Sequence, residues 1–478
     1  MSELKERREQ FVTGLIGGSI SEINYVTAIS VVGYFCTMLL ASRDQTQETY
    51  LVVDFLINWI GMLLSITTYS DNPIVLNCML VVPCFVYWSF TRKRVKVPGE
   101  NALKDKFYLD KKPFITAYRG GMLIITALAI LAVDFKIFPR RFAKVETWGT
   151  SLMDLGVGSF VFSGGLVSAR TLLKDEMGGL RPGFSRKIVR SIRSSAAVLL
   201  LGLLRLYFVK SLDYQEHVTE YGVHWNFFMT LAFLPLALIP IDYIAAYVPR
   251  FILALMISGV YEYFMLYQDG FLEYLVAADR IGLINANREG IFSFLGYCAI
   301  FLWGQTTGFY TLGNIKTKNN MYNPSVSPFK PLKNSTRWDY LTSKSPLYGL
   351  AIWFTITLVF NGLIRELHPL GVSRRFGNLP YVMWVTTYNL GALMVYCSVD
   401  RLFKTNNSWP KESLSLKAMN QNGLIMFLLA NILTGFINMN VPTIDLECHQ
   451  ALAILILYAC ILASLSMLML KRHISIKL

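Results

Sequence analysis

Long runs of apolar residues, separated by shorter polar connections, extend along almost the whole chain. A membrane-spanning helix needs about 20 mostly apolar residues, and thirteen runs have that character. The pattern predicts an all-α polytopic membrane protein with about thirteen transmembrane helices. The predicted spans are 24–41, 51–69, 73–90, 118–134, 150–169, 194–209, 225–240, 251–266, 290–312, 346–364, 379–397, 422–439 and 451–470.

The composition fits a protein that lies mostly inside a membrane. Hydrophobic residues make up 54% of the 478 residues, and charged residues only 16%, against roughly 25% in soluble domains. Little of the chain remains between the spans, so residues 1–478 are expected to form a single multi-span domain. The first two dozen residues contain no apolar run followed by a small-residue cleavage site, so the first span is expected to target the chain.

Some classes of chemistry are disfavoured by the absence of their motifs. The seven cysteines include no CxxC pair, so neither a zinc site nor a disulfide framework is expected. No GxGxxG, P-loop, HExxH or GxSxG pattern occurs, which argues against nucleotide hydrolysis and zinc catalysis. The Gly120-Gly121 pair predicts a close approach between helices.

The net charge of +14 is distributed unevenly over the predicted connections. Thirty Lys and Arg residues lie in the odd-numbered connections and the C-terminal tail, and thirteen lie in the N-terminal segment and the even-numbered connections. The positive-inside rule therefore predicts a lumenal N-terminus and a cytosolic C-terminus. It also explains the basic excess by topology and lipid electrostatics, without nucleic acid as a partner.

Ionisable residues also occur within or beside the spans, where an ionised side chain costs about 2.5–3.5 kcal/mol. All six of them belong to the lumenal side of the predicted topology, which favours one shared polar cavity. Structural ion pairs, for instance Arg205 with Glu262, are the alternative interpretation. The six residues are Asp134, Asp154, Arg205, Glu262, Arg288 and Glu289.

The connection that follows the span 118–134 is unusually rich in charge. A carboxylate such as Asp134 at the C-terminal end of a helix opposes the helix dipole, so capping does not explain it. Pro139 prevents the helix from continuing, and the connection is short enough to fold over the cavity. Arg140, Arg141 and Lys144 then either neutralise Asp134 or contact an anionic substrate. Basic side chains that reach the membrane interface are the alternative.

Histidine offers a second chemistry. His217 and His224 lie seven residues apart and would share one face of a helix, and either has the chemistry of a general base. Hydrogen-bonded structural histidines are the alternative. His368 lies at the end of a span without a neighbouring carboxylate in the sequence, so it is not chosen as a candidate.

Several segments resemble a known family over nearly the whole chain. They are FVTGLIGGSISEIN, residues 111–165, YQEHVTEYGVHWNFF, ANREGIFSFLGYCAIFLWGQ and SRRFGNLPYVMWV. In these segments the chain resembles the GPI inositol acyltransferase family, which includes the fungal GPI-anchored wall transfer proteins and the mammalian phosphatidylinositol-glycan class W protein.

The resemblance implies a multi-pass enzyme of the endoplasmic reticulum membrane that is active in GPI-anchor biosynthesis. Such an O-acyltransferase moves a fatty acyl chain, usually palmitoyl, from acyl-CoA to the inositol of glucosaminyl-phosphatidylinositol. Its expected partners are these two substrates and the membrane lipids, with no nucleic acid, metal or permanently bound cofactor. The family is also the target of an antifungal inhibitor class, which implies a cavity that binds small molecules.

This chemistry gives roles to the candidate residues. Asp134 is expected to act as general base on the inositol hydroxyl, and Lys144 to stabilise the oxyanion that forms from the thioester. Basic residues near the cytosolic end of the bundle, Lys111, Lys112 and Arg119, are expected to hold the CoA phosphates. The predicted substrate contacts are Arg119, Arg140, Arg141, Glu146, Asp154, Arg205, His224, Trp225 and Arg288.

Two alternatives remain at this stage. In a membrane-bound O-acyltransferase of the histidine type, His224 would replace Asp134 as the base. A lipid transporter would also need many spans with charged residues between them, but transporters commonly show two matching halves. No such symmetry is visible in this sequence.

Overall fold

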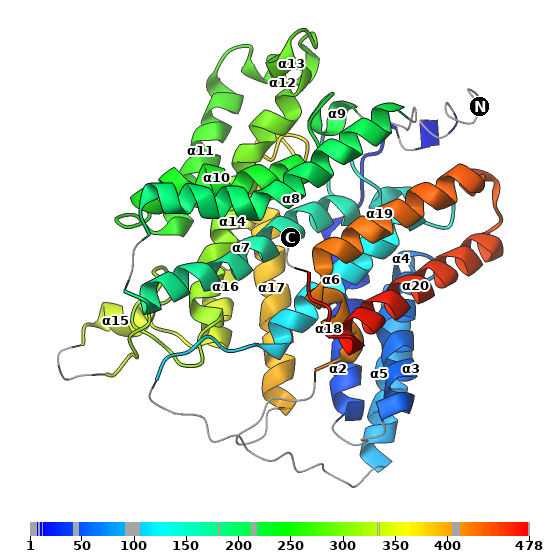
Figure 1. Ribbon diagram of the computed structural model, residues 1–478, viewed down its shortest axis with the longest axis horizontal. Coiled ribbons are helices and arrows are strands. Elements are labelled where there is room, and N and C mark those ends of the chain that lie inside the picture. Colours follow the sequence, from blue (N-terminus) through cyan, green and yellow to red (C-terminus); the bar gives the residue numbers. More distant parts are fainter. Residues whose placement is uncertain are drawn as a thin grey trace.

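The computed structural model describes residues 7, 10, 11, 13–41, 47–90, 106–179, 182–211, 218–331, 333, 335–403 and 412–476. Within these residues helices form almost all of the regular structure, and the only β-type pairings are isolated bridges (Figure 1). The prediction of an all-α polytopic protein is confirmed. The candidate histidine His217 lies outside the described residues.

The longer helices follow the apolar runs of the sequence. In chain order they are α2 (Ile20–Ala41), α5 (Pro73–Phe90), α6 (Pro113–Ala132), α7 (Leu152–Met177), α8 (Phe184–Ser211), α10 (Phe227–Ile244), α11 (Arg250–Tyr267), α14 (Arg288–Thr311), α16 (Pro346–Leu367), α17 (Leu379–Phe403), α19 (Gly423–Asn440) and α20 (Cys448–Lys471).

Shorter elements connect them. They are α3 (Gln47–Phe55), the π-helix η1 (Leu56–Ile60), α4 (Gly61–Ile66), the 3-10 helix η2 (Arg140–Phe142), α9 (Val218–Tyr221), α12 (Phe271–Ala277), α13 (Leu283–Ala286), α15 (Arg337–Thr342), α18 (Leu414–Gln421) and the 3-10 helix η3 (Thr443–Asp445).

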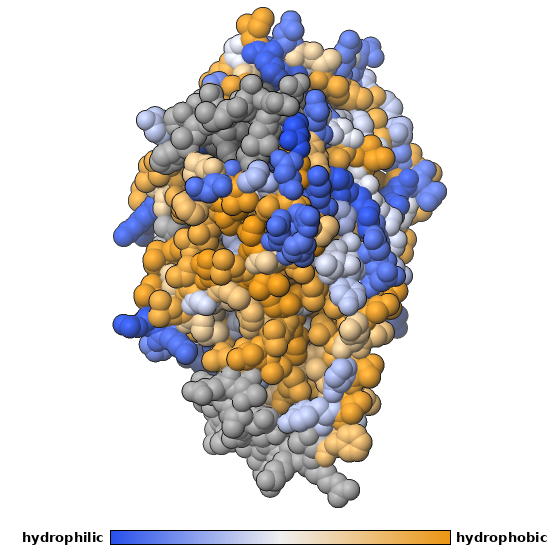
Figure 2. All heavy atoms as spheres, turned by 90° about the vertical axis from the view of Figure 1, so that its right-hand side faces the viewer, coloured by the Kyte–Doolittle hydropathy of each residue, from blue (hydrophilic) through white to orange (hydrophobic). Residues whose placement is uncertain are grey.

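Ten of the described helices are long and apolar enough to cross a membrane: α2, α5, α6, α7, α10, α11, α16, α17, α19 and α20. Each overlaps one of the predicted spans, so the chain is a multi-pass membrane protein. Figure 2 shows the outer face on the side of α5, α19 and α20, where hydrophobic residues cover a broad area. These helices carry exposed apolar side chains such as Val82, Phe436 and Leu457.

The remaining three predicted spans are helical but differ from the expectation. The run 51–69 is divided among α3, η1 and α4, and the run 194–209 is the second half of α8, whose first half is basic. The run 290–312 forms α14, which is less apolar than a lipid-facing helix because α7, α11 and α17 surround it. The number of spans and the lumenal position of the N-terminus stay predictions.

Close contact between α7 and α14 forms the most tightly packed part of the bundle. Gly165 of α7 lies against the backbone of Phe301, and Gly304 of α14 lies against the backbone of Phe162. A Cβ atom at either glycine would collide with a carbonyl oxygen, so only glycine permits this approach. Small residues allow the same closeness between helices within membranes.

Helix α6 runs through the middle of the bundle and contacts α17, α18 and α19 (Figure 1). The predicted close approach at Gly120 is made to the backbone of Leu416 in α18. At the same level, the Tyr118 hydroxyl donates a hydrogen bond to Asn389 in α17. Within their membrane-spanning stretches 72% of α6 is buried, but only 22% of α19, so α19 is an outer helix.

Candidate functional site

A cavity of about 1020 Å³ lies beside α6, which is at the upper end of the 300–1,000 Å³ that is usual for ligand sites. Its lining extends along α6 from Tyr118 to Ile130, or about 18 Å at 1.5 Å per residue, and continues to Asp134 in the turn that follows. Helices α7, α8, α10, α17 and α19 contribute the other walls. Most of the lining is apolar, and its charged residues are Asp134, Lys144, Glu146, Arg205, Glu220 and Arg374.

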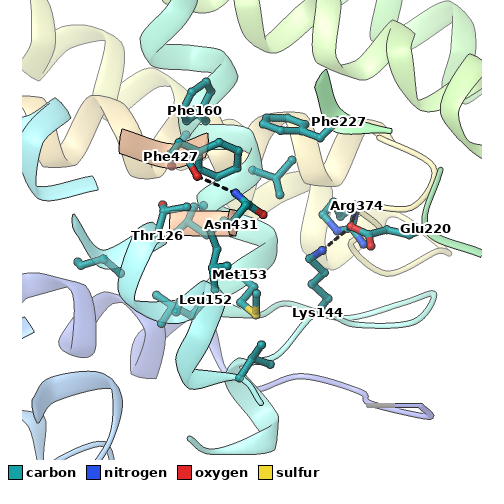
Figure 3. A pocket seen from close by; sticks show the side chains of 18 of the residues that line it. Thr126, Lys144, Leu152, Met153, Phe160, Glu220, Phe227, Arg374, Phe427 and Asn431 are labelled. Atoms are coloured by element: carbon teal, nitrogen blue, oxygen red, sulfur yellow. Dashed lines mark hydrogen bonds and ion pairs between the residues drawn. The ribbon is translucent and has the colours of Figure 1, made fainter. Parts of the chain in front are cut away.

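Aromatic rings form a large part of the apolar wall (Figure 3). The ring of Phe160 in α7 lies 5.7 Å from that of Phe227 in α10 and 5.7 Å from that of Phe427 in α19, measured between centroids. Three helices that are far apart in the sequence therefore meet at one hydrocarbon surface. Such a surface suits an acyl chain, because the chain can bury its apolar area against it.

The segment 133–151, which we call the rim connection, forms the charged end of the cavity. Helix α6 ends at Ala132, and Asp134 lies in the turn that follows it. Three aromatic side chains of the connection, Phe135, Phe138 and Phe142, are fully buried. They anchor the connection to the bundle, so its polar side chains are held in fixed places.

Arg140 stabilises the turn that contains Asp134. Its guanidinium donates to the backbone oxygens of Val133, Phe135 and Phe138 at 2.8, 3.1 and 2.9 Å. The carbonyl group of Val133 at the end of α6 has no partner within the helix, and Arg140 pairs with it and with two carbonyl groups of the turn that follows. Burial lowers the pKa of Arg140 to about 10, and the nearby Asp134 carboxylate opposes that shift. Arg140 does not line the cavity among the described residues.

Asp134 lines the cavity and is held by a residue of α19. The side-chain amide of Asn438, in the last turn of α19, donates a hydrogen bond of 2.8 Å to its Oδ2. The carboxylate therefore has one oxygen fixed by a neutral donor. A carboxylate in such a position is suited to accept a proton from a bound hydroxyl group.

Lys144 lines the same cavity, and its Nζ lies 2.7 Å from Oε1 of Glu220 in α9 (Figure 3). The guanidinium of Arg374, in the connection between α16 and α17, lies 3.3 Å from the same oxygen. Burial alone would raise the pKa of Glu220, but Lys144 and Arg374 outweigh it and lower that pKa to about 2. Glu220 is thus ionised, and it holds the lysine ammonium in place.

Asp154 forms the foundation of this network without lining the cavity. It lies in the first turn of α7, where Ser151 is the N-cap. One of its carboxylate oxygens accepts a 2.7 Å hydrogen bond from the Ser151 hydroxyl and a 3.1 Å hydrogen bond from the backbone amide of Val145. Its other carboxylate oxygen accepts a 2.5 Å hydrogen bond from Nε of Arg374. Asp154 thereby connects α7 to Arg374 and fixes the rim connection one residue after Lys144.

Other predicted contacts lie at the cavity wall. Glu146 lines the cavity and accepts a 2.8 Å hydrogen bond from the amide of Gly14. Arg205 of α8 and Trp225 line it as well. The Trp225 indole donates 2.8 Å to the hydroxyl of Thr230, which fixes the orientation of the ring.

The remaining predicted contacts serve other parts of the molecule. Arg141 forms ion pairs with Glu22 and Asp71. The backbone amide of His224 donates 2.7 Å to Asn287. Arg288 donates to the backbone oxygens of Leu275 and Asn285, and Arg119 lies within α6. None of these four predicted residues (Arg119, Arg141, His224 and Arg288) is among the described residues that line the cavity.

The expectation of one cavity for all six lumenal charges is therefore wrong. Of the six, Asp134 and Arg205 line the cavity, while Glu289 is buried with Arg280 at 2.6 Å and Arg375 at 3.1 Å. The six charges are divided among different sites because a buried charge that is paired with a nearby opposite charge does not need contact with a water-filled cavity.

Glu262 does not pair with Arg205, as the alternative interpretation had predicted, but with His368. The exclusion of His368 for lack of a carboxylate partner was therefore wrong. Glu262 of α11 lies 2.9 Å from Nε2 of His368 and accepts 2.6 Å from the amide of Leu379. The contact joins α11 to the two ends of the connection 368–379, which carries Arg374. The sequence could not indicate that Glu262 is the partner of His368, because the two residues belong to different spans that are far apart in the chain.

Sequence reasoning also missed Glu220, Arg374 and Asn438. Arg374 belongs to the segment SRRFGNLPY, which carries part of the family resemblance, and two adjacent arginines beside a span were an available signal. Glu220 and Asn438 gave none, because each acquires its importance from a partner far away in the chain. In the described residues no group of three or more His, Cys, Asp or Glu side chains is arranged to hold a metal ion.

Comparison with known proteins gives matches over almost the full chain. Residues 4–469 match the sequence profile of the family GWT1. Relatives called GPI-anchored wall transfer protein 1 are 52% identical in Saccharomyces cerevisiae, 54% in Eremothecium gossypii and 42% in Candida albicans. In each case the match covers 100% of this chain and 100% of the relative.

Proposed function

The chain belongs to the GWT1 family, and from this premise we propose that it transfers a fatty acyl chain, usually palmitoyl, from acyl-CoA to the inositol of glucosaminyl-phosphatidylinositol. The shared name of its relatives supports a role in GPI-anchor biosynthesis. The proposed location is the endoplasmic reticulum membrane, where both substrates meet.

The observation that supports the proposal is a cavity with a long apolar wall whose lining also contains a carboxylate, Asp134, and an ammonium group, Lys144. Both substrates have anionic heads and long acyl chains, so each needs apolar length and a polar reaction centre. The lining along α6 offers the length, and Asp134 and Lys144 line the polar end. A cavity for a small polar metabolite would not need so much hydrocarbon surface.

The proposed reaction begins with the inositol hydroxyl beside Asp134. The carboxylate takes the hydroxyl proton while the oxygen attacks the thioester carbon of acyl-CoA, and a C–O bond forms. The carbonyl oxygen becomes an oxyanion, which the Lys144 ammonium stabilises. The intermediate then collapses, the C–S bond breaks, and the CoA thiolate leaves and takes up the proton. A thiol has a pKa of about 8.5, so its thiolate leaves without much assistance.

Glu220 is compatible with this role of Lys144. An ammonium group has three N–H donors, and the Glu220 carboxylate, 2.7 Å from Nζ of Lys144, accepts from one of them. The remaining donors are available to a thioester oxygen. In this arrangement Glu220 and Arg374 position the lysine, while Asn438 of α19 positions the base.

The decisive experiment measures acyl transfer from palmitoyl-CoA to glucosaminyl-phosphatidylinositol in membranes that contain equal amounts of each variant. Asp134→Asn is expected to lower the rate by about 10²–10⁴-fold, because it removes a general base. Lys144→Ala should also be strongly impaired. Asp175→Asn, which alters an exposed ion pair on α7 away from the cavity, is the matched control and should retain its activity.

Full activity of Asp134→Asn would exclude the proposed mechanism. Loss of activity in His224→Ala alone would favour the histidine alternative. The proposed route of acyl-CoA from the cytosol is tested separately with single cysteines at Lys111, near the start of α6, and at Asp71, beside the rim connection. Labelling of both cysteines from the same side of the membrane would contradict that route.

A further inference from the structure

One side of the cavity is open between two outer helices. Four of its lining side chains are well exposed: Leu204 of α8 at 43%, and Ile432, Phe436 and Met439 of α19 at 58%, 60% and 66%. On α6, by contrast, the lining residue Ala129 is only 4% exposed. The exposed lining side chains of α8 and α19 are apolar, as they would be at a surface in contact with lipid.

A cation lies at the edge of this opening. Arg205 follows Leu204 on α8, lines the cavity and is itself exposed. Its charge acts on Glu220 inside the cavity, so it is near the reaction centre. The preceding stretch of α8, residues 195–204, contains no charged residue. A guanidinium beside an apolar opening suits a phosphodiester, because its planar fork matches phosphate oxygens.

The other arginine of the cavity lining is already engaged. Arg374 is 4% exposed and holds both Asp154 and Glu220. Arg140 and Arg141, which were also candidates for phosphate contact, bind backbone oxygens and carboxylates instead. The described part of the lining thus leaves Arg205 as the arginine best placed to meet an anion that arrives from the membrane.

We propose that the opening between α8 and α19 admits the inositol phospholipid directly from the bilayer, and that Arg205 contacts its phosphodiester. The lipid tails stay in the opening, against Leu204, Ile432 and Phe436, while the inositol ring extends inward toward Asp134. The acyl chain of the donor then occupies the apolar part of the cavity along α6. This inference rests on the proposed function and adds the route and the phosphate contact of its acceptor substrate.

A matched pair of substitutions on α8 tests the route. Leu203 and Leu204 are 49% and 43% exposed, but only Leu204 is among the described residues that line the cavity. Leu204→Trp is expected to raise the apparent KM for the glycolipid about tenfold, as a bulky ring fills a hydrophobic passage, and to leave the KM for acyl-CoA unchanged. Leu203→Trp should match the wild type in both constants.

The phosphate contact is tested at Arg205. Loss of a charge-assisted hydrogen bond is worth about tenfold or more, so Arg205→Gln should raise the KM for the glycolipid by that factor. Arg205→Lys should recover part of the loss, because it restores the charge without the fork. A merely structural role of Arg205 would instead lower kcat, change both KM values together and show no recovery with lysine.

Two further measurements decide between the outcomes. A water-soluble glycolipid analogue with very short acyl chains does not need the lateral route, so Leu204→Trp should use it as well as the wild type does. A photoreactive phosphatidylinositol in phosphatidylcholine vesicles should label α8 and α19, and excess unlabelled phosphatidylinositol should suppress this labelling in the wild type but not in Arg205→Gln.

Equal behaviour of the two tryptophan variants, or a changed KM for acyl-CoA alone, would overturn the proposed route. Labelling elsewhere on the protein would overturn it too. The labelling experiment needs no turnover, so it separates this inference from the proposed function. A wild-type protein that transfers no acyl group but is labelled at α8 and α19 would contradict only the proposed function.

Discussion

The cavity has one wall that is tightly packed and another that is not. On the packed side, α7 is joined to α14 through Gly165 and Gly304, and Asp154 holds Arg374. On the open side, α8 and α19 leave lining side chains exposed, and a Cβ atom placed on Gly435 of α19 would meet nothing within 4 Å. The difference indicates that the charged groups need rigid support, while the lipid-facing wall is free to yield.

The largest effect is expected from Arg374→Met, which breaks the packed side at its buried charge. Asp154 and Glu220 would lose a shared partner, and removing one member of a buried ion pair costs about 3–5 kcal/mol. Thermal unfolding of the purified protein in detergent measures the loss. A variant as stable as the wild type would show that this network does not support the packed side.

The second prediction compares one glycine from each wall. Gly304→Val is expected to destabilise the protein by about 3 kcal/mol, because the added carbons collide with the backbone of Phe162 and cannot be relieved by a side-chain rotation. Gly435→Val should change stability by less than about 0.5 kcal/mol, because a Cβ atom at this position meets nothing within 4 Å. Equal effects on the melting temperature would remove the contrast between the walls.

The third prediction concerns acid. The unfolded chain, with an ordinary glutamate pKa of about 4.3, takes up a proton before folded Glu220, whose pKa is about 2. Stability from this group is therefore complete above pH 4.3 and is lost as the pH falls toward 2, by on the order of 2 kcal/mol. In unfolding measured against pH, Glu220→Gln should lose this part of the acid sensitivity.

The exposed Glu366 of α16 provides the control for that titration. Glu366→Gln should keep the acid profile of the wild type, because Glu366 takes no part in the ion pairs around Glu220. If the Glu220 and Glu366 variants show the same acid profile, the ion pairs around Glu220 do not supply the acid-sensitive stability.

The smallest effect on stability is expected at Ile432, on the open side. Ile432→Ala should change the free energy of unfolding by less than about 0.5 kcal/mol, since the side chain is mostly exposed to lipid. Detergent melting curves measure this directly. A loss of 2 kcal/mol or more would mean that α19 is packed as firmly as α7, contrary to the comparison.

The sequence predicted the apolar helices well because hydrophobic length is a local property. At 290–312 the sequence predicted a helix, which is α14, but it did not show that neighbouring helices bury this helix and accommodate Glu289 and Gln305 inside the bundle. The rim connection was identified for a related reason. Charges such as Asp134 and Lys144 are costly beside a membrane, and their presence is visible without knowledge of the fold.

Partners could not be predicted in the same way. Lys144, Glu220 and Arg374 meet only because α9 and the connection 368–379 come together over the cavity. The sequence also gave no means to separate Arg140, which caps a helix end, from Lys144, which faces the cavity. Both are basic residues of one short connection, and only the direction of each side chain distinguishes them.

The rim connection has a consequence for changes in the surrounding bilayer. Helices tilt when the thickness of the hydrocarbon layer changes, and outer helices such as α19 respond first. Asp134 and Lys144, however, both belong to the rim connection, which Phe135, Phe138 and Phe142 anchor in the interior. Sterol content or lipid chain length should therefore affect how readily an amphiphile is captured, and should hardly alter the spacing of the two groups proposed to react with it.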